Sequence, residues 1–129
     1  MLPFSGMSTA EARAFADLWL PAWTGNDPSH LLSFYTDDAF YADPAIPRGV
    51  QGHDALLAYF TRLLRRYPDW TWVQIGSIPL EGGFLNQWRA RIPLGDGVVE
   101  IDGVCTVQLR DDLIARNVVH FDRSLLLRG

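Results

Sequence analysis

The sequence predicts an α+β fold in which three helices pack against a cone-shaped, curved antiparallel sheet. Two observations support this fold class. Apolar residues recur at helical spacing in the first half of the chain, whereas from residue 70 onward they alternate with polar residues, as in half-buried strands. A chain with its helices first and its strands later gathers the helices on one face of the sheet. We expect residues 1–7 to be a flexible N-terminus and residues 8–129 to form a single domain.

Each predicted helix has recognisable ends. Ser8 and Glu11 have the spacing of a capping box at the start of the first helix, whose apolar stripe continues to Trp23. Asp27 followed by Pro28 has the pattern of a helix start, with proline in the first turn. The predicted second and third helices cover residues 29–35 and 54–67.

The predicted strands are separated by turns rich in glycine and aspartate. A short strand covers residues 39–42, and the proline after Asp43 ends it because that residue is held in extended geometry. Two prolines and two glycines make residues 44–52 a loop, which we expect to gate a cavity. The four long strands are predicted at residues 70–80, 84–94, 98–109 and 113–122.

Composition argues against several classes of function. The net charge is −4, and basic residues cluster only around Arg62–Arg66, so we expect no nucleic-acid partner. Cys105 is the one cysteine, which excludes an intramolecular disulfide and a thiolate metal cluster. No run approaches the roughly 20 apolar residues of a membrane span, and residues 1–7 lack the features of a signal peptide. We therefore expect a cytoplasmic protein with no membrane partner, no metal and no cofactor.

The last strand carries the candidate reactive groups. His120 and Asp122 are two residues apart, so in a regular strand they point to the same side of the sheet. Polar groups at the end of an apolar strand are costly unless they are paired or used. They could form a structural ion pair or a reactive site, and because both faces of this strand carry apolar residues, the inward side stays open.

Short motifs along almost the whole chain resemble one family. The motifs are Trp23–Asp27, Leu31–Ala39, Asp43–Pro44, Val50–Gly52, Tyr67–Asp69, Gly103–Val104 and His120–Asp122. Their order and spacing resemble the SnoaL-like polyketide cyclases of the nuclear transport factor 2-like superfamily, which also includes the ketosteroid isomerases and the limonene-type epoxide hydrolases. The resemblance implies a cone-shaped fold with an apolar cavity, although this fold hosts both enzymes and binding modules.

The resemblance also suggests catalytic residues. Asp122 is similar in position to the acid/base of the cyclases and epoxide hydrolases, and His120 could orient it. Asp43, before a proline, resembles the general base of the isomerases. Trp19 and Cys105 stand where the isomerases have oxyanion-hole donors, and neither supplies a strong donor. The Arg–Asp pair of the epoxide hydrolases is also missing. The sequence therefore argues against assigning either isomerase or epoxide hydrolase activity.

These residues lead to two expectations about function. The first is a cofactor-independent enzyme of cyclase or isomerase type, in which a cavity carboxylate transfers a proton on a hydrophobic, carbonyl-bearing small molecule. The alternative is a non-catalytic module for ligand binding or dimerisation. An exposed sheet face, including some of Trp70, Trp72, Val73 and Ile75, leads us to expect a homodimer through the sheet. The expected ligand-binding residues are Trp19, Trp23, Tyr41, Phe60, Trp88 and Cys105.

Overall fold

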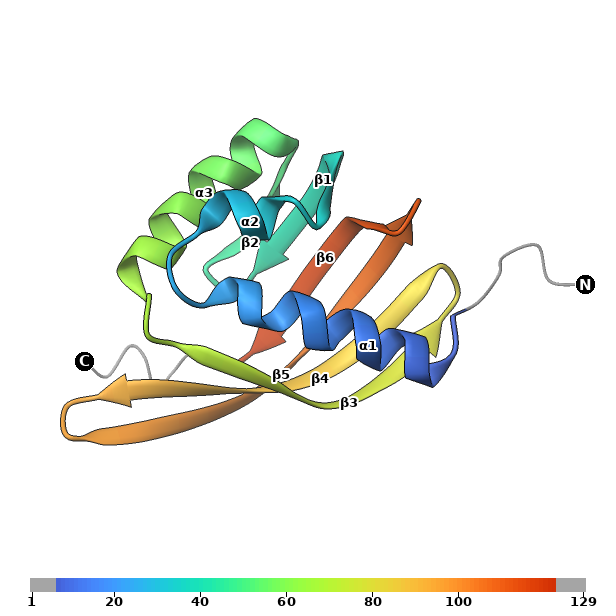
Figure 1. Cartoon of the computed structure of the whole chain (residues 1–129). Helices are drawn as coiled ribbons and strands as arrows, with labels where there is room; N and C mark the ends of the chain where they lie inside the picture. The colour runs from blue at the N-terminus through green and yellow to red at the C-terminus, as the bar shows by residue number, and fades with distance from the viewer. Residues whose placement is uncertain (1–6, 123–129) are drawn as a thin grey trace, which may run out of the picture.

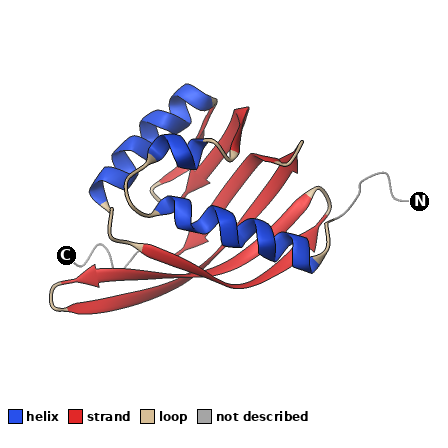
Figure 2. Cartoon of the chain, viewed as in Figure 1, coloured by secondary structure: helices blue, strands red, loops and turns tan. Residues whose placement is uncertain are grey.

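The computed structural model describes residues 7–122 and shows helices on one face of a curved, open sheet (Figures 1 and 2). Three α-helices and one 3-10 helix lie within these residues: α1 (Thr9–Trp19), η1 (Leu20–Trp23), α2 (Pro28–Leu32) and α3 (His53–Arg66). The strands are β1 (Tyr35–Asp43), β2 (Ile46–Gln51), β3 (Thr71–Leu80), β4 (Gly83–Leu94), β5 (Gly97–Arg110) and β6 (Leu113–Phe121). The expected flexible segment 1–7 lies, except for Met7, outside the described residues.

The sheet has the strand order β2-β1-β6-β5-β4-β3. The pair β1–β6 is parallel, and the other four pairs are antiparallel. The last strand of the sequence therefore lies in the middle of the sheet, beside the first. In Figure 1 the β4–β5 hairpin extends beyond the helices, at the end where α3 leads into β3.

Local interactions explain why the helices begin where they do. Ser8 Oγ accepts a hydrogen bond from the backbone N–H of Glu11, and the Glu11 carboxylate accepts one from the backbone N–H of Ser8, as predicted for a capping box. Asp27 caps α2 through the backbone N–H of His30. The buried face of α3 carries Leu56, Tyr59, Phe60 and Leu64.

The predicted fold class is confirmed, with differences near the N-terminal edge of the sheet. Residues 46–51 form β2, which pairs with β1, so the expected gating loop is wrong. None of residues 44–52 lines the tryptophan-rich cavity described below. Tyr35 begins β1 rather than ending a helix, and the sheet is mixed because β1 and β6 run in parallel. Short strands at a sheet edge carry a weak periodic signal, which the prolines and glycines of this segment obscured.

One extra residue in β6 determines which side chains of that strand face the helices. Gln108 pairs with Arg116 and Leu109 with Ile114, so Ala115 is a β-bulge. A bulge reverses the alternation of the side chains that follow it. Ile114 and Asn117 are consequently both fully buried, whereas His120 is exposed.

No helix within residues 7–122 is long and apolar enough to cross a membrane.

Candidate functional site

All five tryptophans of the chain line one cavity between the helices and the sheet. Its volume is about 80 Å³, which is small beside the roughly 300–1,000 Å³ of drug-sized ligand pockets. Apolar side chains form most of the rest of its wall. The residues that line it are Trp19, Leu20, Trp23, Tyr41, Asp43, Leu63, Leu64, Tyr67, Trp70, Trp72, Trp88, Ala90, Ile92, Ile101, Cys105, Asn117, Val119 and Phe121.

Neighbouring aromatic rings form a continuous wall from Tyr41 to Tyr67. Trp23 lies 5.7 Å from Tyr41 and 6.2 Å from Trp72, measured between ring centroids. Trp70 lies 5.9 Å from Trp72 and 4.2 Å from Tyr67. Because each ring has a partner at a tilted angle, the wall is held by aromatic contacts as well as by burial.

A glycine makes room for the fifth tryptophan. Trp88 on β4 lies against Gly103 on β5, where an added Cβ atom would collide with the indole ring. On the other side, Phe121 packs against the same ring at a centroid distance of 5.7 Å. Gly103 therefore fixes the position of this part of the cavity wall.

Asp43, the last residue of β1, is the one carboxylate among the described residues that line the cavity. It is 7% exposed. Its Oδ2 accepts hydrogen bonds from the hydroxyls of Tyr41 and Tyr59, at 2.8 and 2.7 Å. Its Oδ1 accepts bonds from the backbone N–H groups of Ala45 and Ile46, at 2.8 and 3.1 Å. Four donors occupy the roughly four acceptor positions of a carboxylate, so the side chain is held in one orientation.

The negative charge of Asp43 has no cationic partner among residues 7–122. None of the ion pairs within these residues includes it. Burial, and next the nearby charge of Asp43, raise the pKa of Tyr41 well above its usual value, so this phenol stays protonated. No group of three His, Cys, Asp or Glu residues within the described chain could hold a metal ion.

A second polar group lies around the hydroxyl of Tyr35. Asn117 on β6 donates a hydrogen bond from Nδ2 to this hydroxyl at 3.1 Å. Burial raises the pKa of Tyr35, and the neighbouring Asn117 and Trp19 side chains lower it to a smaller extent. Burial also raises the pKa of the Cys105 thiol to about 12, so this cysteine is a protonated, unreactive wall residue.

A groove adjoins the cavity beside the α3–β3 connection. Tyr67, Trp70 and Ile92 line both the cavity and a shallower groove that continues over Pro68 and Pro93. Arg66, which also borders this groove, stacks on the Tyr67 ring with its guanidinium carbon 5.4 Å from the ring centroid. The groove thus lies between the end of α3 and the end of β4, from which the β4–β5 hairpin projects beyond the helices (Figure 1).

The structure brings together most of the residues that the sequence suggested, but not the pair on the last strand. Asp43 and five of the six expected ligand-binding residues line the cavity: Trp19, Trp23, Tyr41, Trp88 and Cys105. Phe60 lies behind them, fully buried against Trp23, Tyr35 and Tyr41.

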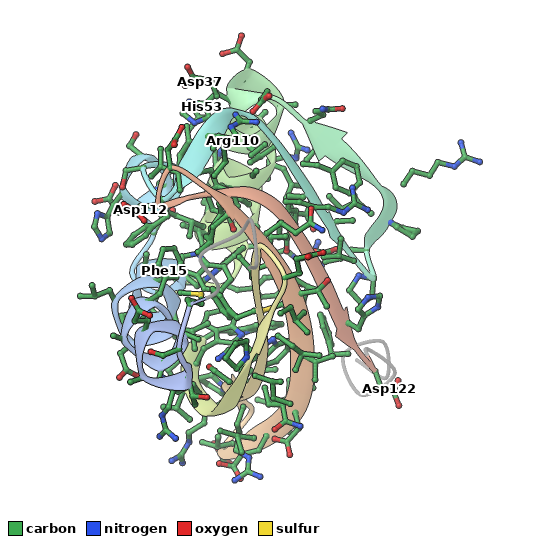
Figure 3. All side chains as sticks on the ribbon, turned by 90° about the vertical axis from the view of Figure 1, so that its right-hand side faces the viewer. Phe15, Asp37, His53, Arg110, Asp112 and Asp122 are labelled. Atoms are coloured by element: carbon green, nitrogen blue, oxygen red, sulfur yellow. The ribbon has the colours of Figure 1, made fainter. Side chains whose placement is uncertain are left out.

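The structure does not bring His120 and Asp122, the candidate reactive groups of the last strand, to the cavity. Both residues are exposed, and neither contributes to the cavity wall. Figure 3 shows Asp122 at the end of β6, directed away from the body of the molecule. The bulge at Ala115 explains the difference, because it turns Asn117, Val119 and Phe121 inward instead.

Sequence reasoning missed several residues of the site. Asn117 carries no motif, and its fully buried position became apparent only with the bulge. The sequence left open which of Trp70, Trp72, Val73 and Ile75 face outward. Trp70 and Trp72 line the cavity, whereas Val73 and Ile75 are exposed. Tyr59 could have been noticed, because its hydroxyl lies on the otherwise apolar buried face of α3 and needs a partner there.

Comparisons with known proteins agree with this architecture. The sequence model of the SnoaL-like domain family matches residues 12–117. A hypothetical protein from Catenulispora acidiphila with a ketosteroid isomerase-like fold, solved in complex with trimethylamine, superimposes with a TM-score of 0.77 at 16% identity, covering 88% of this chain and 89% of that chain. A SnoaL-like protein of unknown function from Burkholderia thailandensis gives 0.76 at 20% identity, covering 92% and 99%.

A third solved structure, described as a candidate SnoaL-like polyketide cyclase from Shewanella putrefaciens, has a TM-score of 0.74 at 14% identity, covering 92% of this chain and 84% of that chain. Identities this low establish the shared fold alone. A search of curated proteins found no match.

Proposed function

Because this chain belongs to the SnoaL-like domain family, we propose that it binds a small organic molecule in the tryptophan-lined cavity, with Asp43 as the charged contact. The observation that carries the proposal is the buried Asp43 carboxylate, held by four hydrogen bonds beside the cavity. A charge is costly to bury unless it is paired or used. The hydrogen bonds satisfy its lone pairs, but within residues 7–122 nothing neutralises its charge.

A small alkylammonium ion is the ligand that best complements these groups. The faces of aromatic rings attract cations, most strongly in tryptophan, and quaternary ammonium groups are commonly recognised by aromatic cages. Trp23 and Trp72 supply such faces beside Tyr41, whose hydroxyl reaches Asp43. A cation with an apolar surface therefore gains from both the rings and the carboxylate. The volume of about 80 Å³ restricts it to a small cation.

The structural neighbour from Catenulispora acidiphila supports this ligand class, because it was solved in complex with a small aliphatic amine, trimethylamine. At 16% identity the neighbour shares the fold, and its ligand enters the argument as an example of what this fold can hold.

Proton transfer is the second candidate function. Asp43 lies beside an apolar cavity, and the family resemblance includes cyclases and isomerases that move protons without a cofactor on carbonyl-bearing substrates. In the observed arrangement both carboxylate oxygens already accept two hydrogen bonds, so Tyr41 or Tyr59 would have to release Oδ2 before Asp43 could take a proton. Recognition of a cation needs no such rearrangement, and this difference places binding first.

Ligand titrations of matched charge and shape would test the proposal. Tryptophan fluorescence reports on the cavity directly, because every tryptophan lines it. We expect tetramethylammonium chloride to bind and to change the fluorescence in a saturable way, whereas sodium chloride at the same ionic strength and neutral tert-butyl alcohol have no such effect. Equal responses to the alcohol and the cation would contradict charge recognition.

A substitution would then assign the charge. Asp43→Asn keeps the shape, and the Tyr41 and Tyr59 hydroxyls can turn to accept from the new amide. We expect it to weaken tetramethylammonium binding at least tenfold, since the ligand loses a buried opposite charge. Asp96→Asn, in the exposed β4–β5 turn, removes the same charge and should leave binding unchanged. An exchange assay for protons adjacent to a ketone, with parent and Asp43→Asn proteins, would detect proton transfer.

A further inference from the structure

Two buried polar atoms on the cavity wall have no hydrogen-bond partner. They are the indole Nε1 of Trp19, on α1, and the amide Oδ1 of Asn117, on β6. The two residues are 1% and 0% exposed, and both line the cavity. Almost all buried polar atoms in folded proteins are paired, so an unpaired donor and an unpaired acceptor in one cavity wall indicate a partner that residues 7–122 do not supply.

Both side chains lie beside the hydroxyl of Tyr35. Asn117 binds the Tyr35 hydroxyl through Nδ2, and the Trp19 side chain is close enough to that hydroxyl to affect its pKa. Turning the Asn117 amide over would exchange its oxygen and nitrogen, but one of the two would still lack a partner. The Trp19 N–H can only donate. The missing group must therefore accept from Trp19 and must match either end of an amide, which is the property of a hydroxyl.

Asn117 also lies close to Asp43 in the sheet. Asn117 pairs with Tyr41 across the parallel β1–β6 ladder, and Asp43 follows Tyr41 by two residues. Standard strand geometry puts the Cα atoms of Asn117 and Asp43 about 8 Å apart. Both side chains line the same cavity, so one small ligand can reach both.

We propose that the cavity recognises a hydroxyl group on its ligand through Trp19 and Asn117, so that the ligand class is a small alkylammonium alcohol. This inference rests on the proposed function, which assigns the ammonium group to Asp43 and the aromatic wall. The hydroxyl accepts a hydrogen bond from Trp19 Nε1 and exchanges one with the Asn117 amide. The aliphatic link between the two groups lies against the tryptophan rings.

The test compares two cations that differ only at the proposed contact. Choline carries a hydroxyl where propyltrimethylammonium carries a methyl group, and the two are otherwise the same in charge and similar in size. We expect choline to bind about tenfold more tightly to the parent protein, as two modest hydrogen bonds would provide. The dissociation constants are measured by calorimetry at one ionic strength.

Variants then assign that preference. Asn117→Leu removes the amide group and Trp19→Phe removes the indole N–H, while each keeps an apolar side chain, and we expect each to reduce the preference to about threefold or less. Asn86→Leu is the matched control: it also replaces a fully buried asparagine, but Asn86 does not line the cavity, so the preference should stay. If Asn117→Leu fails to fold, Trp19→Phe decides alone.

The outcomes separate this inference from the proposed function. If both cations bind equally, or if the preference survives in Asn117→Leu and Trp19→Phe, ordered water serves the two atoms and the inference is wrong, while cation binding stands. If neither cation binds, the proposed function fails and takes this inference with it.

Discussion

The Tyr59 hydroxyl, on α3, lies 2.7 Å from Oδ2 of Asp43, at the end of β1. This bond joins the helix layer to the sheet at the cavity wall. Tyr41 approaches the same oxygen from within β1, so two phenols and two backbone N–H groups fix one carboxylate. Hydrogen bonds to an ion are about twice as strong as neutral ones. Asp43 thus contributes to the packing of α3 as well as to the charge of the cavity.

Removing the Tyr59 hydroxyl should weaken the fold without changing it. We expect Tyr59→Phe to lower the free energy of unfolding by about 2 kcal/mol, the usual cost of losing a hydrogen bond to a charged group. Urea denaturation followed by circular dichroism measures the change. The control is Tyr67→Phe, because the Tyr67 hydroxyl makes no hydrogen bond with residues 7–122; it should shift stability by less than about 0.5 kcal/mol. Equal losses in the two variants would show that Tyr59 acts through its ring alone.

The position of Trp88 should depend on Gly103. An added Cβ at Gly103 would collide with the Trp88 ring and would lie 2.8 Å from the backbone oxygen of His120. We expect Gly103→Ala to cost about 1–3 kcal/mol and to shift the tryptophan emission, because overpacking moves the ring or the strand. Gly97→Ala, in the same strand, meets no atom closer than 4.0 Å and should be nearly neutral. An unchanged emission and stability in Gly103→Ala would contradict the account of this wall.

Cys105 should be unreactive until the protein unfolds. Burial raises its pKa to about 12, so the thiol is protonated at neutral pH in the native state. The raised pKa favours folding below pH 9.0, the ordinary pKa of the thiol, and this contribution is lost as the pH rises from 9.0 towards about 12. A thiol-specific chromogenic disulfide should react slowly with the native protein at pH 8 and rapidly in urea. Fast reaction without denaturant would show that the cavity wall opens readily.

Much of this fold, but less of its site, could be predicted from the sequence. The capping box at Ser8 and the change of period at residue 70 predicted helices and strands because each is a local pattern. The bulge at Ala115 is not a local pattern, because it depends on how β6 pairs with β5. This one extra residue turns Asn117 towards the cavity and leaves Asp122 outside it. The sequence likewise left open which of Trp70, Trp72, Val73 and Ile75 face outward, since only strand parity assigns the two tryptophans to the cavity.

We propose that the protein is a homodimer through the outer face of its sheet. Val73 and Ile75 on β3 are 55% and 48% exposed, on the side opposite the cavity-lining Trp72. An exposed apolar patch on a sheet commonly marks a self-complementary interface. Light scattering should give twice the chain mass of 14.5 kDa, and Val73→Glu should shift it towards the monomer. Leu18→Glu, on the exposed side of α1, should leave the dimer intact. A monomer mass for the parent protein at micromolar concentration would contradict this interface.

The central claim, that the cavity holds a cation against Asp43, can be tested most directly by a crystal structure with tetramethylarsonium, a heavier analogue of tetramethylammonium. The arsenic atom scatters anomalously, so its position can be located independently of the surrounding density. We predict one strong anomalous peak inside the cavity, within about 6 Å of the Trp23 and Trp72 ring centroids, the range of cation–π contacts. The peak should be absent from crystals of Asp43→Asn grown under the same conditions. A parent crystal with no peak in the cavity, or with peaks only on the outer surface, would contradict the claim.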